Sequence, residues 1–160
     1  MTADLGDLLA IAESTLAGLQ TATDHITGFA LQFGDEICEI GRQLTIHPEL
    51  APAVRAFVER TAPVIASDVR LGRWLGRVYD AAESRSSDTE EYVRALALRS
   101  ALEFFRDLYR DSVAHDYVAG IETEDTDANL KDWGAQQYLE DIPPGFPPSH
   151  VWWHQSLSGK

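Results

Sequence analysis

The chain has 160 residues, 44% of them hydrophobic and 9% aromatic, which is enough for one domain with a real core and excludes disorder throughout. Its 26 acidic and 13 basic side chains give a formal net charge of −13, which disfavours a broad nucleic-acid or membrane-binding surface and permits a basic protein partner. No apolar run approaches the ~20 residues that cross a bilayer, and the first residues lack a signal peptide's basic start. We therefore expect a cytoplasmic protein, and the single Cys38 excludes an intramolecular disulfide.

The charges are segregated along the chain. Residues 1–41 hold seven acids and no Lys or Arg, residues 42–116 hold all eleven arginines against twelve acids, and residues 117–160 hold seven acids and two lysines. The acidic segments could pair with the arginines inside the protein, or face solvent and attract a basic partner. Internal charge matching is the simpler interpretation, because exposed ion pairs are common and individually weak.

From Leu5 to Leu44 apolar residues recur every three or four positions, which predicts a long amphipathic helix. Capping residues between Thr21 and Asp24 allow a break there, but we favour one continuous helix because the apolar spacing is kept across them. A helix of this length could expose part of its apolar face, which would allow a homodimer.

Two further helical stretches follow. An amphipathic pattern runs through residues 48–82, with a kink expected at Pro63. Ser87 and Glu90 form a capping box for a third helix, which ends near Gly120. No strand pattern competes, so the sequence predicts an all-α fold, an antiparallel bundle of three long helices.

Residues 121–160 differ in kind from the bundle that residues 1–120 are expected to form. An acidic loop at 122–127 precedes a short helix predicted over 127–139, and residues 141–154 carry four prolines within six positions. Such a segment cannot be helical, so we expect an extended strap that packs on the bundle within a single domain overall.

The aromatic content of this tail marks a candidate binding segment. Three of the four tryptophans lie in the last 28 residues. The candidate partner-binding residues are Trp133, Phe146, Trp152 and Trp153. The simpler interpretation is that these large side chains pack along the bundle and close its core, and the alternative is that they dock on a partner.

His150 and His154 stand four residues apart, after Ser149. If Ser149 starts a helical turn, both imidazoles share one face and could hold a metal or a ligand. Two ligands do not make a site, and the sequence offers no obvious third beside them. We therefore predict no metal and no cofactor.

The third helix carries a regular pattern of charge. Its acidic and imidazole side chains recur every four residues with arginines between them, at Glu103, Asp107, Asp111 and His115 and at Arg99, Arg106 and Arg110. Facing inward, such groups could form a metal or acid–base site in a bundle. Opposite charges at this spacing more simply form ion pairs on an exposed helix face, which is the interpretation we favour.

A cluster of arginines raises the question of phosphate binding. Arg70, Arg73 and Arg77 share one predicted helix face beside Trp74. Arginines next to an exposed indole can bind phosphates or stack on bases. In so acidic a chain, the simpler interpretation is that these arginines form ion pairs with the acidic first helix. We therefore do not predict nucleic-acid binding.

These observations favour a non-enzymatic interaction or regulatory protein, because no coherent catalytic set is present. It would engage a protein partner, a basic one if acidic helix faces bind it, through those faces or through the Pro- and Trp-rich tail. An acidic inhibitor of a basic toxin or nuclease is a related hypothesis. The alternative is a small helical enzyme or ligand-binding protein, with a pocket between the bundle and the segment that holds His150, Trp152 and His154.

Overall fold

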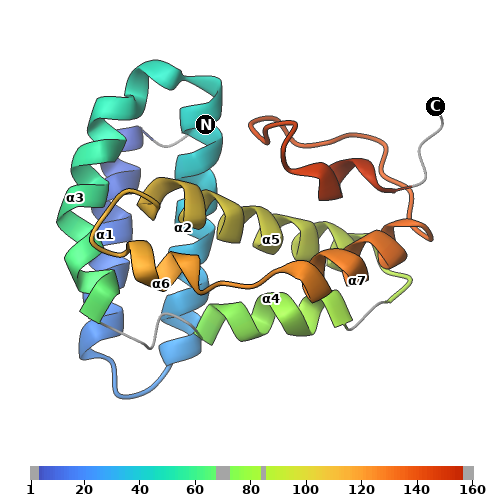
Figure 1. The fold of residues 1–160 in the computed structure, drawn as a ribbon, viewed down its shortest axis with the longest axis horizontal. Helices are drawn as coiled ribbons and strands as arrows, with labels where there is room; N and C mark the ends of the chain where they lie inside the picture. Colours follow the sequence, from blue (N-terminus) through green and yellow to red (C-terminus); the bar gives the residue numbers. More distant parts are fainter. Residues whose placement is uncertain (1–3, 68–72, 84–85, 157–160) are drawn as a thin grey trace.

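The computed structural model describes residues 4–67, 73–83 and 86–156 of the chain (Figure 1). This part is all-α, as the sequence predicts, with seven α-helices and no β-strand. The helices are α1 (Leu5–Thr21), α2 (Ile26–Ile46), α3 (Ala51–Ser67), α4 (Arg73–Glu83), α5 (Thr89–Tyr109), α6 (His115–Ala119) and α7 (Glu124–Gly134), with short 3-10 turns η1 (Pro48–Leu50) and η3 (Val151–His154). None of these helices is long and apolar enough to span a membrane.

The N-terminal helix is broken, which corrects the continuous helix that the apolar spacing favoured. α1 ends at Thr21, and His25 adopts a left-handed backbone conformation, φ 57°, directly before α2. The two helices pack against each other (Figure 1), and a Cβ on Gly18 would lie 3.0 Å from the Phe29 ring. The apolar spacing survives the break because both helices turn their apolar faces toward the same core.

The second and third predicted helices are also divided. Pro63 lies at an exposed position inside α3, and the helix continues to Ser67, so the proline does not end it. Asp88, rather than Ser87, is the N-cap of α5, and its Oδ1 accepts the backbone N–H of Glu90 at 2.9 Å. The three long helices of the prediction correspond to the pairs α1–α2, α3–α4 and α5–α6, and the chain changes direction within each pair (Figure 1).

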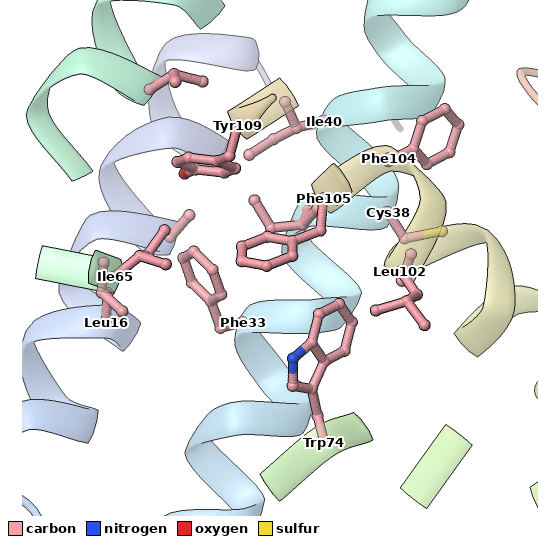
Figure 2. Packing of buried hydrophobic residues seen from close by; sticks show 14 of the residues in the cluster. Leu16, Phe33, Cys38, Ile40, Ile65, Trp74, Leu102, Phe104, Phe105 and Tyr109 are labelled. Carbon is pink, nitrogen blue, oxygen red and sulfur yellow. The ribbon is translucent and has the colours of Figure 1, made fainter. Parts of the chain in front are cut away.

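The helices form two groups. α1, α2 and α3 stand side by side, and α5 crosses them and extends away together with α4 and α7 (Figure 1). The main core lies where α5 meets the first group, and Figure 2 shows its aromatic centre. There the fully buried Trp74 packs edge-on against Phe105, with 5.7 Å between the ring centroids.

The C-terminal part begins with α7, which starts earlier and ends earlier than the predicted helix over 127–139. Glu124 and Asp125, which the sequence analysis assigned to a loop, lie in its first turn, where carboxylates are favoured by the helix dipole. Residues 135–150 contain no helix and run back beside α5 (Figure 1). The extended strap predicted over 141–154 is therefore wrong at its end, where Val151–His154 form the 3-10 turn η3.

Candidate binding surfaces

The aromatic side chains of the tail lie in a second buried cluster, on α5 and α7 rather than in the main core. Trp133, Trp152 and Trp153 expose only 2%, 4% and 1% of their surface, and they surround the buried Tyr92 and neighbouring residues of α5. Phe146 is half-buried and stacks on Trp153, with ring centroids 4.5 Å apart. The structure therefore brings the four predicted partner-binding residues together, and it offers none of the three indoles to solvent.

Ser100 holds this cluster together. The indole Nε1–H groups of Trp152 and Trp153 both donate to its Oγ, at 2.9 and 2.8 Å, and the same Oγ lies 2.9 Å from Nδ1 of His150. We call these four residues the Ser100 hub. A hydroxyl has one hydrogen to donate, and since both of its other contacts are donors, that hydrogen points to Nδ1. The hub thus assigns a neutral His150 imidazole that accepts at Nδ1 and carries its hydrogen on Nε2.

The environment of His150 supports the neutral form. The side chain is fully buried, and its Nε2 has no hydrogen-bond partner. Burial lowers the pKa of His150 to about 4, an effect that the carboxylate of Glu103 opposes and the guanidinium of Arg99 strengthens. A buried N–H without a partner costs free energy, and the hydroxyl of Tyr92 in the same cluster is likewise buried without one.

A serine beside a histidine is the pairing used in nucleophilic catalysis, and it was not foreseen from the sequence. Ser100 and His150 are fifty residues apart, and both are fully buried. A substrate cannot reach Ser100 Oγ, whose remaining contacts are the two indoles. In this arrangement Ser100 and His150 are enclosed within the fold.

His150 and His154 are not brought together as ligands. His150 precedes the 3-10 turn η3 and is buried, whereas His154 ends that turn and is exposed. No group of three or more His, Cys, Asp or Glu side chains in the described part of the chain could hold a metal ion. The two imidazoles face different environments because the segment does not form the helical turn that would align them.

The charged face of α5 is partly interior, which sequence reasoning missed. Arg99 exposes only 3% of its side chain and forms a two-pronged ion pair with Asp127 of α7, at 2.6 and 3.2 Å. It also binds Glu103 at 3.0 Å and lies 4.0 Å above the ring of Trp152. Farther along the helix, Arg110 pairs with Asp107 at 2.7 Å on the exposed face, as predicted.

The predicted arginine cluster does not present an indole. Trp74 is fully buried against the main core, so it cannot stack on a ligand. Arg77 is exposed on α4, while Arg70 and the side chain of Arg73 lie outside the described part of the chain.

A groove of about 640 Å³ lies between α3, the end of α2 and the end of α5, and we call it the α3–α5 groove. Its apolar lining consists of Leu44, Ala51, Val54, Val58, Ala62, Pro63, Leu108 and Val113. Four charged side chains border it, the acidic Glu59, Asp107 and Asp111 and the basic Arg55. Val113 exposes 70% of its surface, which is unusual for an aliphatic side chain beside other apolar groups.

Asp107 stands at the edge of this groove in a partly desolvated position. Burial raises its pKa, and so does the nearby charge of Glu103, while Arg110 and its neighbours oppose the rise. Asp107 keeps nearly half of its side chain exposed and is already paired with Arg110 at 2.7 Å.

The chain matches no known family. Models of protein families, curated proteins and solved structures were each compared with it, and none matches. Its function must therefore be argued from these surfaces.

Proposed function

We propose that this is a non-enzymatic interaction protein that binds a protein partner in the α3–α5 groove. The occupant that fits is an amphipathic helix with an apolar face and Lys or Arg side chains beside it. The proposal rests on one observation: three carboxylates and one arginine border an apolar groove, in a chain of net charge −13.

The dimensions of the groove suit a helix of the partner. Its lining on α3 extends from Ala51 to Pro63, which is ~18 Å at 1.5 Å per residue. Three helical turns of a partner cover this length and present apolar anchors at positions i, i+3 or i+4, and i+7. Val54 and Val58 form the buried floor of the groove, with 2% and 8% of their surface exposed, and the anchors would also contact Pro63 and Val113 at its exposed edges.

The charge at the border favours a basic occupant. Glu59 and Asp111 are both exposed, on α3 and just beyond α5, on two sides of the groove. Basic side chains flanking the partner's apolar face could reach both, and the acidic surface as a whole would accelerate their encounter. This agrees with the acidic-face route that the sequence suggested.

Binding of a partner through the aromatic tail has less support, because Trp133, Trp152 and Trp153 are buried. The enzyme or ligand-binding alternative has the same weakness, since the pocket it requires would have to open around His150. The hollow that Trp153 and His154 line has about 270 Å³ and the one that Trp133 lines has about 390 Å³, so both are smaller than the α3–α5 groove.

A designed peptide can test this proposal. The probe is a fluorescent amphipathic helix of about three turns with Leu anchors and flanking lysines, compared with a version that has glutamates in place of the lysines. Its affinity is measured by fluorescence anisotropy for the wild-type chain and for a variant with Glu59→Lys and Asp111→Lys. We expect the variant to bind the lysine peptide at least about tenfold more weakly, because both border charges are reversed.

A matched control carries Asp24→Lys and Glu140→Lys, which change the net charge equally at exposed positions outside the groove. It should bind the lysine peptide within about threefold of the wild type. Equal weakening in both variants would mean that only net charge matters, and the groove would lose its role. Failure of the lysine peptide to bind at all would also count against the proposal.

A further inference from the structure

The segment that contains His150 is held down at two places of different chemistry. At one end, Arg42 of α2 donates from Nε to the carbonyl oxygen of Pro144 at 2.8 Å, and Gly145 turns the chain with φ 93°. At the other end the Ser100 hub binds residues 150–153. The first contact joins a guanidinium and a backbone carbonyl, and neither group gains or loses a proton in mild acid. The second contact depends on a neutral imidazole, which can gain one.

We propose that residues 147–154 form an acid-sensitive latch: protonation of His150 breaks the Ser100 hub, and the segment swings away from α5 about Gly145 while the Arg42 contact holds. Opening would bring Trp152 and Trp153 into solvent. This inference does not depend on the α3–α5 groove.

The hydrogen bonds of the hub cannot accommodate a second imidazole proton. The proton would enter at Nδ1, the only basic nitrogen of the neutral ring, and would convert that atom from an acceptor to a donor. Ser100 Oγ would then face three donors, the two indoles and Nδ1–H, and its own hydrogen would lose its acceptor. Buried donors without acceptors are costly, whereas in the open state water satisfies all of them.

The charges on α5 act on an imidazolium at position 150 in opposite directions. Arg99 is buried one residue before Ser100 and adds a positive charge. Glu103 is the carboxylate that favours protonation, but it already accepts Arg99 at 3.0 Å and lies 3.6 Å from Arg106. Glu103 favours protonation of His150 more than Arg99 opposes it, but burial of the imidazole outweighs both charges and lowers its pKa.

On α7 and α2, the carboxylates near the latch are paired with arginines. On α7, both carboxylate oxygens of Asp127 accept hydrogen bonds from Arg99. On α2, Arg42 lies 5.2 Å from the ring centre of Phe146, and Glu39 pairs with Arg42 at 3.2 Å. Glu140 and Asp141 also lie near the latch, where they line a hollow together with Trp153 and His154.

The opening can be local because the two tryptophans of the latch pack in the second cluster and not in the main core. His150 contacts the main core through Phe104, with 4.7 Å between the ring centroids. The backbone hydrogen bonds of the latch are internal to it, from His150 N–H to Pro147 and from Trp153 N–H to His150. Such segments open at lower free energy than the helices that they cover.

The size of the effect follows from the lowered pKa. A change from the ordinary value of 6.5 to about 4 means that complete protonation shifts the closed–open equilibrium by roughly 300-fold toward open. The shift develops as the pH falls from the ordinary pKa of histidine toward that of the buried group.

The test follows hydrogen exchange of residues 147–154 in the full chain, together with tryptophan emission and far-UV circular dichroism, between about pH 7 and pH 4. We expect exchange of the latch, corrected for its intrinsic pH dependence, to accelerate at least about tenfold and the emission to shift to the red, while the helical signal is kept. The variant His150→Asn keeps an acceptor oxygen near the position of Nδ1 and cannot take the proton, so it should stay closed. The matched control His154→Asn, at an exposed position of the same segment, should open like the wild type.

Two outcomes would overturn the latch. One is that His150→Asn opens at the same pH as the wild type, and the other is that the helices unfold together with the latch. If His150→Asn does not fold, nitrogen NMR of the wild-type protein can instead show which ring nitrogen of His150 carries the hydrogen at about pH 7. A hydrogen on Nε2 supports the hydrogen bonds of the hub, and a hydrogen on Nδ1 contradicts them.

Discussion

The indole of Trp74 lies directly on the backbone of Gly34, so closely that a Cβ at residue 34 would overlap the ring. Trp74 is fully buried and also packs against Phe105, so the indole has no room to withdraw. This single glycine allows α4 to dock on α2.

We therefore expect Gly34→Ala to destabilise the protein by about 1–3 kcal/mol through overpacking, although alanine favours helices. The matched control is Gly28→Ala in the same helix, where a Cβ would meet nothing within 4 Å. That substitution should stabilise the protein by up to about 1 kcal/mol. Chemical denaturation of the two variants checks the opposite signs, and equal effects would contradict the packing argument.

The buried hydrogen bond between Thr61 and Tyr109, 2.6 Å long, predicts an order of stabilities. Thr61 Oγ1 donates to the carbonyl oxygen of Phe57 at 2.8 Å, so the tyrosine hydroxyl is the donor to Thr61. Tyr109→Phe removes that donor and should cost about 1 kcal/mol. Thr61→Val leaves the hydroxyl of Tyr109 buried without an acceptor and should cost more, about 1–3 kcal/mol. Thermal or urea unfolding measures both, and the reverse order would show that the donor is assigned wrongly.

Arg99 should not be replaceable by lysine. Its two contacts with Asp127 and its position over Trp152 require a planar fork, which an ammonium group does not provide. We expect Arg99→Lys to lose about 1–3 kcal/mol of unfolding free energy. Arg110→Lys is the control, since Arg110 is exposed and pairs with Asp107 by a single contact, and it should change stability by less than about 0.5 kcal/mol.

Glu36 gives a prediction with a defined pH dependence. It is buried between α1 and α2, its Oε2 accepts from Thr15 at 3.1 Å, and its Oε1 has no partner. Burial raises its pKa above 4.5, while the hydrogen bonds from Thr15 and Gln32 oppose the rise. The folded protein thus binds this proton more tightly than the unfolded chain does, so the contribution of Glu36 to stability is present below its ordinary pKa and is lost as the pH rises through the raised value.

Glu36→Gln should accordingly be more stable than the wild type at neutral pH, and its advantage should shrink as the pH falls through the titration of the carboxyl. Urea unfolding at several pH values measures the difference. Glu140→Gln, at an exposed position, should show no comparable trend. A constant difference between Glu36→Gln and the wild type at all pH values would contradict the argument.

Much of the fold could be read from the sequence because helical periodicity is a local property. The apolar positions from Leu5 to Leu44 do point into a core, and the prolines at 143–148 lie outside any helix, as predicted, although the strap ends in the 3-10 turn η3. The break at residues 22–25 could not be decided in the same way. An apolar stripe looks identical whether the helix continues or doubles back, and the choice depends on which core the second half meets.

The residues of the candidate site also fall into those that the sequence could indicate and those that only tertiary packing reveals. Trp133, Trp152 and Trp153 could be singled out by composition, because large aromatic side chains in a short tail must be buried or bound. Ser100 could not, since nothing in its neighbourhood in the sequence distinguishes it from a surface serine. It becomes the centre of the hub only because the strap returns to α5 and brings His150 and two indoles onto one hydroxyl.

The sequence by itself thus determined the all-α class, the positions of the apolar faces and the non-helical prolines of the tail, because each follows from residues within a few turns of one another. The tertiary structure alone decided that Arg99 is an interior residue, that the tryptophans share Ser100, and that an apolar groove stays open between α3 and α5. These features depend on contacts between residues far apart in the chain. Such contacts are selected by the packing of the whole molecule, which no local pattern encodes.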